Sequence, residues 1–197
     1  MSDITTRVSV VGESIYPHLN RPDVRFNDYG EYKVTLKVGK QDAQSMVKLI
    51  DQAIEENIAT AEKEAKGKTI KPAPKPYKIE GDNVFFKYKM RASGTNKKTN
   101  EKFSQRPALF DAKKNPIPAS QNIWGGSLMK VAYQLIPYNS PAIGAGVSAR
   151  LKAAQIIKLV EGKNQNVFKE EDGFETTKTE EKTNSNAHAE IQASSDF

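Results

Sequence analysis

The sequence predicts a mainly β fold with one α-helix and a disordered C-terminal tail. Apolar and polar residues alternate in several short runs, which is typical of strands with one buried face. Residues 42–66 instead repeat apolar side chains at spacings of three and four, which predicts an amphipathic helix. From residue 163 onward the apolar residues are isolated, and such a segment cannot bury enough surface to offset the entropy of ordering it. We therefore expect a folded domain over residues 1–162 and a disordered tail over residues 163–197.

The strands are expected at intervals along the domain. Residues 7–11 predict a short first strand, and the segment after it, which contains Pro17 and Pro22, is expected to be a loop. The other strands are expected in the runs EYKVTLKV, NVFFKYKMRAS, KFSQRPALFD, SLMKVAYQLIPY and VSARLKAAQIIKLVEG, the last with a bulge near residues 153–155. Tyr138 is expected in the Pro- and Gly-rich loop PYNSPAIGAG.

The helix is expected to have Asp42 as its N-cap and Gly67 as the glycine that ends it. The segment GKTIKPAPKPYK that follows contains three prolines and is expected to be an extended connection. About five short strands and one helix fit a five-stranded Greek-key barrel of the OB type, which presents one face and its loops to a ligand. Fold alone does not establish function, so particular residues must indicate it.

Composition excludes several classes of protein. The chain has no Cys, which excludes disulfides, thiol catalysis and thiolate metal sites. No apolar run approaches the roughly 18 residues of a membrane helix, and the first residues lack the pattern of a signal peptide. The two histidines lie far apart, and no phosphate-binding loop, nucleophile elbow or HExxH motif occurs. We therefore expect a cytoplasmic protein that is not an enzyme and that binds no metal or cofactor.

Charge is divided unevenly along the chain. Residues 1–162 hold 26 basic and 16 acidic residues, whereas residues 163–197 hold four Lys and eight acids, so the domain carries +10 and the tail −4. A basic domain with an oppositely charged tail is typical of a protein that binds a polyanion. A basic but otherwise unremarkable surface explains the charge alone equally well.

The segment NVFFKYKMRAS is the most informative strand. Its outward face carries Phe85, Lys87, Lys89 and Arg91. Cations that follow one another at about 7 Å repel each other unless an anion neutralises them. Cations for phosphates and an exposed ring for bases are the two ingredients of single-strand binding. A solubilising strand face is the alternative interpretation of the same pattern.

The neighbouring residues favour nucleic acid. A polar loop rich in Lys follows this strand, and a second strand is expected to return from it, so the two form a hairpin whose tip can close over an extended polyanion. The candidate phosphate-binding side chains are Lys87, Lys89, Arg91, Lys97, Lys98, Lys102, Arg106 and Lys130. The candidate stacking rings are Phe85, Phe103 and Tyr138.

Several ordered stretches resemble the single-stranded DNA-binding proteins of T7-type bacteriophages. They are GEYKVTLKV with the helix after it, KPYKIEGDNVFFKYKMRAS with its NKKTNEK loop, GGSLMKVAYQLIPY and IGAGVSARLKAAQIIKLVE. The terminal Asp196 and Phe197 are similar to the end of that family's acidic tail. The similarity covers nearly the whole domain and is weaker before Gly30.

The resemblance implies an OB-fold that coats single-stranded DNA in phage replication, recombination and repair and that promotes annealing of complementary strands. It also implies a homodimer whose tail contacts the phage DNA polymerase and primase-helicase. By position in the matching motifs, it places Lys89 and Tyr138 on the DNA-binding surface and Lys97 and Lys98 in a basic loop. Phe197 corresponds to the terminal aromatic residue of the tail.

The expected mechanism is coating without regard to sequence, with an affinity that falls steeply as salt rises. The anionic tail is expected to occupy the empty groove and to be displaced by DNA, which leaves Phe197 free for a partner. Two alternatives use the same side chains. One is an RNA-binding or RNA-chaperone module of the OB type, which a comparison of deoxy- and ribo-oligomers would separate. The other is a basic adaptor protein that binds an acidic protein partner.

Overall fold

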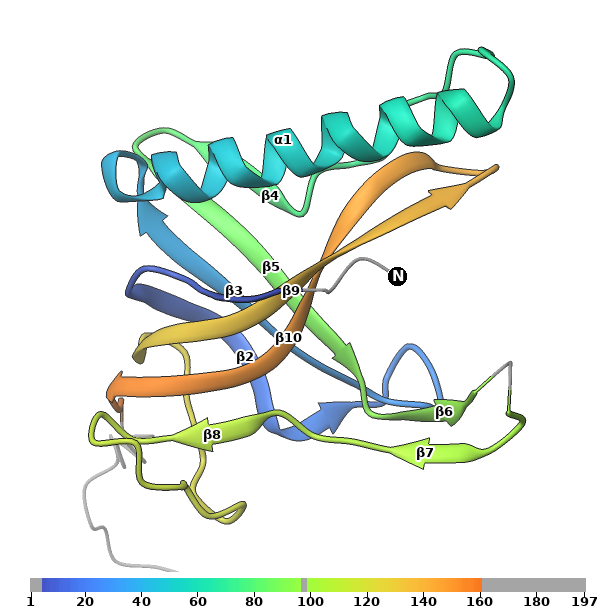
Figure 1. The fold of residues 1–197 in the computed structure, drawn as a ribbon. Helices are drawn as coiled ribbons and strands as arrows, with labels where there is room; N and C mark the ends of the chain where they lie inside the picture. Colours follow the sequence, from blue (N-terminus) through green and yellow to red (C-terminus); the bar gives the residue numbers. More distant parts are fainter. Residues whose placement is uncertain (1–4, 97–98, 161–197) are drawn as a thin grey trace, which may run out of the picture. The chain divides into compact units, whose positions relative to one another are not determined.

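The structure is a computed structural model that describes residues 5–96 and 99–160. Within these residues it contains ten strands and one helix, which confirms the mainly β class (Figure 1). The elements in chain order are β1 (Thr6–Val8), β2 (Gly12–Asp23), β3 (Glu31–Gly39), α1 (Lys40–Glu64), β4 (Tyr77–Glu80), β5 (Asn83–Arg91), β6 (Ser93–Thr95), β7 (Lys102–Ser104), β8 (Ala108–Phe110), β9 (Leu128–Ser140) and β10 (Gly144–Lys158).

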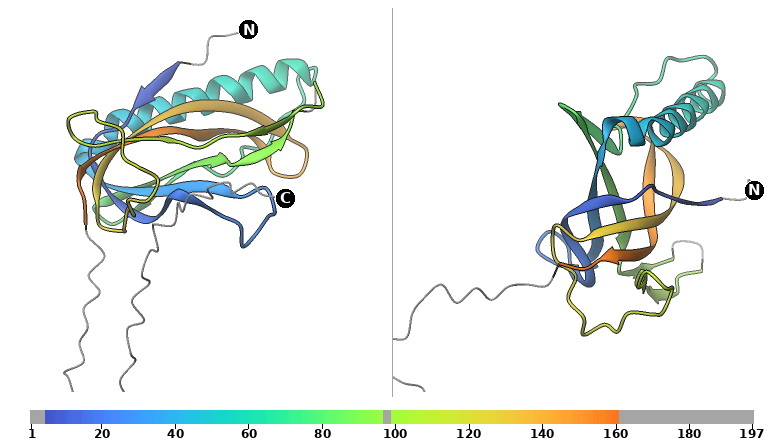
Figure 2. Two further views of the ribbon diagram at one scale, coloured as in Figure 1. Left: turned by 90° about the horizontal axis from the view of Figure 1, so that it is seen from below. Right: turned by 90° about the vertical axis from the view of Figure 1, so that its left-hand side faces the viewer.

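The five longest strands pair in a circuit. β2 pairs antiparallel with β3, β3 with β5, β10 with β9, and β9 with β2. The pairing of β10 with β5 is parallel. Figure 2 shows these strands curling around one interior. β1, β4 and β8 extend the circuit beside β9, β5 and β10 respectively, and β6 and β7 form a separate two-stranded hairpin.

Alternation along the strands separates core from surface. The buried core side chains on the long strands are Leu19, Tyr32, Val34, Leu36, Val38, Val84, Phe86, Tyr88, Met90, Met129, Val131, Tyr133, Val147, Ala149, Leu151, Ala154 and Ile156. Met46, Ile50 and Ile54 of α1 join this core. Full burial of a large apolar side chain is worth about 1.5–3 kcal/mol, so the inward face fixes the register of each strand. The outward residues of β3, β5, β9 and β10 are therefore left on the surface.

α1 lies close to its predicted span, although its N-terminus differs from the prediction. The helix begins at Lys40, and Gly39 occupies the N-cap position without a side-chain hydrogen bond. Asp42 is therefore not the N-cap; it lies in the first turn, where its charge favours the positive end of the helix dipole. At the other end the C-cap is Ala65, and Gly67 adopts a φ of +80° while its N–H donates to a carbonyl one turn back. Lys66, with a φ of +56°, begins the left-handed turn that ends the helix, and Gly67 continues it one residue later.

The segment predicted to be a loop around Pro17 and Pro22 is instead the twelve-residue strand β2. Its pairing with β3 shifts register on both sides of His18, so the prolines lie where the ladder is interrupted. Proline cannot donate a ladder hydrogen bond, and register shifts are what allow it within a strand. The first predicted strand, residues 7–11, corresponds to the shorter β1.

Two details farther along the chain also differ from the sequence pattern, and a third agrees with it. The predicted return strand KFSQRPALFD is split into β7 and β8 just before and after Pro107. Tyr138 does not lie in a loop: it belongs to β9, opposite Gly146 of β10. β10 is a strand as predicted, and its first register shift falls at Lys152, next to the expected bulge at residues 153–155.

The proline-rich connection after α1 is attached to the hairpin formed by β9 and β10. Pro72 forms an isolated β-bridge with Ala145. The Ala73 N–H donates to the carbonyl oxygen of Ala145 at 2.8 Å, and the Ala145 N–H donates to that of Lys71 at 2.9 Å. The extended segment predicted from the prolines is therefore a strap across the hairpin rather than a free connection.

α1 also contacts the same hairpin directly. Asn57 Nδ2 donates to the carbonyl oxygens of Tyr138 and Gly146, each at 2.9 Å. These carbonyls belong to opposite strands of the hairpin, so one side chain ties both strands to the helix.

Candidate nucleic-acid interface

Three cations lie in one row across the outward faces of β3, β5 and β10. Lys33 stands directly opposite Lys89 in the antiparallel pairing of β3 with β5. Lys89 is in turn opposite Arg150 in the parallel pairing of β5 with β10. Neighbouring strands are about 4.8 Å apart, so the like charges of this row repel one another unless anions approach them. The fold therefore builds a site for negative charge from strands that are far apart in sequence.

Carboxylates neutralise part of this row. Lys33 Nζ lies 2.7 Å from Asp23 Oδ2, and Lys89 Nζ lies 3.6 Å from Glu31 Oε1. Arg150 forms no ion pair with any of the residues that the structure describes, and neither does Lys87, two residues before Lys89 on β5. The row retains a net positive charge after its own acids are counted.

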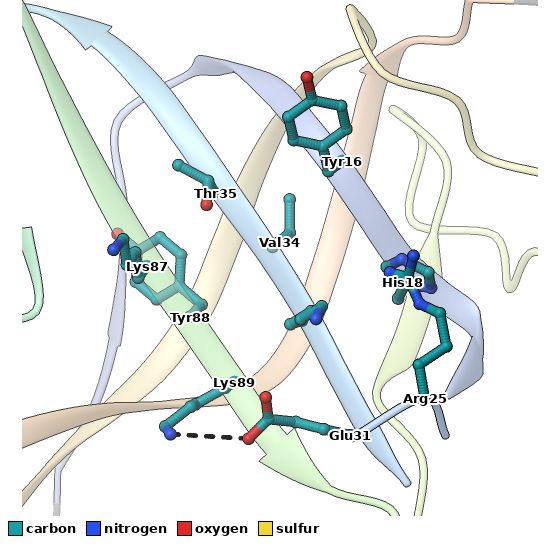
Figure 3. Close-up of a pocket in the computed structure, with 10 residues that line it drawn as sticks. Tyr16, His18, Arg25, Glu31, Val34, Thr35, Lys87, Tyr88 and Lys89 are labelled. Atoms are coloured by element: carbon teal, nitrogen blue, oxygen red, sulfur yellow. Dashed lines mark ion pairs between the residues drawn. The ribbon is translucent and has the colours of Figure 1, made fainter. Parts of the chain in front are cut away.

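A groove of about 630 Å³ is lined by Lys33 and Lys89 of this row, and we call it the basic groove. Its lining residues are Tyr16, His18, Arg25, Glu31, Lys33, Val34, Thr35, Lys87, Tyr88 and Lys89. Figure 3 shows Tyr16 on β2 and Lys87 on β5, with Thr35 of β3 between them, and the ion pair of Lys89 with Glu31. Residues of three strands thus share one depression, and two of the predicted phosphate-binding side chains, Lys87 and Lys89, line it.

A second groove of about 550 Å³ adjoins the first, because Glu31 and Lys89 line both. We call it the hairpin groove. The residues that line it are Glu31, Lys89, Met90, Arg91, Phe103, Gln105, Ile136, Tyr138, Ser148 and Arg150. Four residues predicted from the sequence, on β5, β7 and β9, therefore meet in this groove: Lys89, Arg91, Phe103 and Tyr138.

Side chains around the hairpin groove are held in place by specific contacts. The Arg91 guanidinium lies 4.2 Å from the ring centroid of Tyr29, a cation–π contact. Gln105 Nε2 donates to the Arg91 carbonyl oxygen at 2.9 Å. A side chain on Gly146 would approach the Tyr138 hydroxyl to 3.1 Å, so glycine at this position leaves room for the ring. Arg91 and Tyr138 are thus positioned before any ligand arrives.

A buried carboxylate organises the other end of the basic groove. The Asp23 side chain is 2% exposed, and Arg25 donates to both of its oxygens at 2.9 Å, while Lys33 approaches to 2.7 Å. The hydrogen bonds from Arg25 and Lys33 hold the pKa of Asp23 well below its usual range. Asp23 therefore stays ionised and fixes two cations at the edge of the groove.

Phe26 lies beside these two cations. The residue is 81% exposed, with Arg25 Cζ 5.6 Å and Lys33 Nζ 5.5 Å from the ring centroid. A ring that is exposed and flanked by positive charge presents a stacking face beside phosphate-binding groups. The sequence pattern did not single out this residue, although the adjacent Arg and Phe in a short polar segment were a signal for it.

The structure places four other predicted residues outside both grooves. Phe85 faces outward on β5 opposite Lys37, and Lys102 is exposed on β7. Arg106 lines a separate cavity of about 270 Å³ beside β8. Lys130 lies on β9, opposite Gln155 of β10. Lys97, Lys98, Asp196, Phe197 and the expected domain boundary at residues 162 and 163 lie outside the described residues.

Other kinds of site are absent from the part of the chain that the structure describes. None of its helical segments has the length and apolar character that a membrane span needs. No three metal-ligating side chains within residues 5–96 and 99–160 are grouped so as to hold an ion. The basic groove and the hairpin groove are therefore the main candidate site.

Known proteins are similar to this chain in sequence and in fold. The family model described as the single-stranded DNA-binding protein of bacteriophage T7 matches residues 11–159. A single-stranded DNA-binding protein of Enterobacteria phage T3 is 34% identical over 165 residues, which cover 73% of this chain and 71% of the relative. The protein of the same description from Escherichia phage T7 is 35% identical over 148 residues, which cover 68% of this chain and 64% of that relative.

Solved structures agree with this match. The crystal structure of gp2.5, a single-stranded DNA-binding protein encoded by bacteriophage T7, is similar with a TM-score of 0.73 and 28% identity, covering 88% of this chain and 100% of that chain. The single-stranded DNA-binding protein of bacteriophage Enc34, solved in complex with single-stranded DNA, has the same fold with a TM-score of 0.57 and 17% identity, covering 79% of this chain and 88% of that chain. The family model spans most of the chain and two relatives exceed 30% identity, which confirms the resemblance seen in the sequence: the chain belongs to the family of the bacteriophage T7 single-stranded DNA-binding protein.

Proposed function

We propose that the protein binds single-stranded DNA without regard to sequence, and that the strand runs along the basic groove and the hairpin groove. The observation that carries this proposal is the row of Lys33, Lys89 and Arg150 across three neighbouring strands. Exposed rings border the same grooves, so phosphates and unpaired bases both find partners there. The T3 and T7 relatives are named for this activity, which supports the assignment.

Two contributions to the free energy of binding follow from this arrangement. Cations that neutralise phosphates release the counterions condensed on DNA, so affinity falls steeply as salt rises. Each base that stacks on an aromatic ring contributes about 1–3 kcal/mol. Phosphates are alike at every position and every base has a π-face, so neither contribution distinguishes one sequence from another.

We infer that the circuit of β2, β3, β5, β10 and β9 is the five-stranded Greek-key barrel of the OB type expected from the sequence. The support is that β9 pairs with β10 along most of its length and returns to pair with β2. The basic groove then lies on the face and connecting loop with which OB-folds bind oligonucleotides. The shared fold with the Enc34 protein agrees with this assignment.

We also propose that the protein coats and protects single-stranded DNA during phage DNA replication, recombination and repair in the host cytoplasm, promotes strand annealing, and acts as a homodimer. The C-terminal tail is proposed to recruit the phage DNA polymerase and primase-helicase through its terminal Phe197. Family membership and the negative charge of the tail support this proposal. Deletion of residues 163–197 tests whether the tail competes for the grooves: affinity for oligo-dT rises if it does and is unchanged if it does not.

Fluorescence anisotropy with labelled oligo-dT over a range of salt concentrations tests the central proposal. Lys89→Glu is expected to weaken binding by at least about tenfold and to reduce the salt dependence, because it removes a phosphate contact and adds a repulsion. The loss should be the same for oligo-dT, oligo-dA and mixed sequences. Lys48→Glu is the matched control, since Lys48 is exposed on α1 and lines neither groove.

Other outcomes would favour other functions. Tighter binding of ribo-oligomers than of deoxy-oligomers of the same sequence would indicate an RNA-binding module, since only the 2′-hydroxyl and the thymine methyl group differ. Binding of an acidic protein that oligo-dT does not displace would indicate an adaptor. A loss confined to one sequence would contradict coating.

A further inference from the structure

An aromatic cavity adjoins the basic groove on the side of β2. It has a volume of about 530 Å³, and we call it the Tyr16–Trp124 slot. Its lining residues are Ser14, Ile15, Tyr16, Pro17, His18, Ile123, Trp124, Gly125 and Gly126. Tyr16 and His18 also line the basic groove, so the slot and the groove are continuous. One wall of the slot is β2, and the other is the segment that leads into β9.

The conformation of Tyr16 turns its ring outward against the strand pattern. Gly12 and Ser14 are buried on β2, so strict alternation would place Tyr16 inside as well. Tyr16 instead has a φ of +46° at the register shift before His18, and its side chain is 84% exposed. A positive φ is uncommon for a bulky residue, and backbone strain of this kind is concentrated at functional sites.

The opposite wall of the slot is fixed to β2 by hydrogen bonds. The Gly126 N–H donates to the Ser14 carbonyl oxygen at 2.8 Å, and the Ser14 N–H donates to that of Ser127 at 2.9 Å. Ser14 Oγ donates to the Trp124 carbonyl oxygen at 3.2 Å. Trp124 is nevertheless 50% exposed. Its backbone is therefore held in place while much of its ring is left in water.

We propose that the Tyr16–Trp124 slot binds an unpaired base of the same DNA strand, immediately beyond the basic groove. This inference rests on the proposed function. The slot is continuous with a row of cations, none of its described lining residues is acidic, and both rings offer faces on which any base stacks. A strand leaving the groove past Lys87 thus meets Tyr16 first and Trp124 next.

The fluorescence of Trp124 reports on the slot alone, because it is the only Trp in the chain. The full-length protein is titrated with oligo-dT of increasing length while the Trp emission and the anisotropy of labelled oligomers are followed separately. The shortest oligomers that bind are expected to leave the Trp emission unchanged. Longer oligomers that extend beyond the basic groove are expected to quench it.

Two substitutions at Tyr16 separate stacking from folding. Tyr16→Asn removes the ring, yet Asn tolerates a positive φ better than other residues do. It should weaken binding of the longer oligomers by about 5- to 150-fold, the range expected for loss of one stacked base, and leave the shortest unaffected. Tyr16→Phe keeps the ring and should bind as the wild type does. Ile79→Ala, which removes an exposed apolar side chain on β4 that lines neither the slot nor either groove, is the control and should have no effect.

Each remaining outcome is decisive. If oligo-dT of every length binds without quenching Trp124, and Tyr16→Asn binds as tightly as the wild type, the slot proposal is wrong while single-strand binding stands. Equal losses for Tyr16→Asn and Tyr16→Phe would also overturn it, since stacking would not be the cause. If the wild type does not bind oligo-dT, or Lys89→Glu binds it unchanged, the proposed function itself fails. Should Tyr16→Asn not fold, Trp124→Ala measured by anisotropy replaces it with the same expected length dependence.

Discussion

Lys33 and Lys89 stand directly opposite each other on β3 and β5, but their carboxylate partners hold them differently. The partner of Lys33 is the buried Asp23 at 2.7 Å, whereas the partner of Lys89 is Glu31 at 3.6 Å, and the Lys89 side chain is 60% exposed. An exposed and loosely paired ammonium can exchange its carboxylate for a phosphate at little cost. Of these two lysines, Lys89 is therefore the one that is more ready to bind a phosphate, while Arg150 has no ion pair to give up among the described residues.

Removal of the competing carboxylate should strengthen binding. Glu31→Gln frees Lys89 and takes one negative charge out of both grooves, so affinity for oligo-dT is expected to rise by about two- to fivefold at low salt. Anisotropy at low and high salt measures this change, and the gain should shrink as salt rises. Glu13→Gln, which breaks the ion pair with Lys37 outside the grooves, is the control. A gain of equal size in the control would show that only net charge matters.

Asp23 should make stability depend on pH in the acid range. Its folded pKa lies below the ordinary value of 3.8, so its contribution is fully present above that value and is lost as pH falls toward the folded pKa. Asp23→Asn is expected to lower the Tm at pH 6, and the difference from the wild type should narrow below about pH 4. Thermal unfolding from pH 6 to pH 2 tests this. A constant difference across that range would mean that the charge of Asp23 is not what stabilises the fold.

Arg150 should contribute to binding as much as the cations of β5 do. Arg150→Gln removes one phosphate partner from the hairpin groove, so affinity should fall for every sequence and the slope of log K against log salt should decrease by about 1. Lys158→Gln, at the exposed end of the same strand, should leave the slope unchanged. A wild-type slope for Arg150→Gln would place the DNA path away from β10.

Gly144 should be the least replaceable glycine in the described residues. A Cβ there would lie 2.0 Å from the Lys71 carbonyl oxygen, and the φ of +99° is strained for any other residue. Gly144→Ala is expected to reduce the free energy of unfolding by about 2–5 kcal/mol, from backbone strain and the displaced strap together. Gly81→Ala, at a φ of +55° with open space around it, should cost only about 1 kcal/mol. Urea unfolding of both variants measures the difference, and equal losses would contradict the clash.

The sequence predicts well what depends on local periodicity. The alternation around Tyr88 places Lys87, Lys89 and Arg91 on the outward face of β5, as the structure shows. The three- and four-residue spacing of α1 gives its span to within two residues at either end. Both patterns reflect a single element that buries one face, and neighbouring residues are enough to reveal it.

The sequence does not predict what depends on long-range pairing. Arg150 joins Lys89 only because β10 runs parallel to β5, and no local pattern specifies that neighbour. The sequence did not predict β2, because Pro17 and Pro22 strongly favour a loop. Only the register shifts in the pairing of β2 with β3 allow these prolines in a strand. Tyr16 and Phe26 were missed for the same reason, since a segment expected to be a loop gives no indication of which rings face the groove.

The β9–β10 hairpin is attached both to α1 and to the strap, which holds the wall of the hairpin groove beside Tyr138 firmly in place. Asn57 and the strap at residues 71–73 join the strands beside Tyr138 to the helix, so that wall cannot swing outward without breaking backbone contacts. Phe26, at the far end, belongs to the connection between β2 and β3; the Asp23 cluster holds one side of this connection, and the hydrogen bond from Ser93 to the Tyr29 carbonyl oxygen holds the other. If a bound strand varies in curvature, we expect the exposed Phe26 side chain to adjust to it, while the wall beside Tyr138 keeps its place.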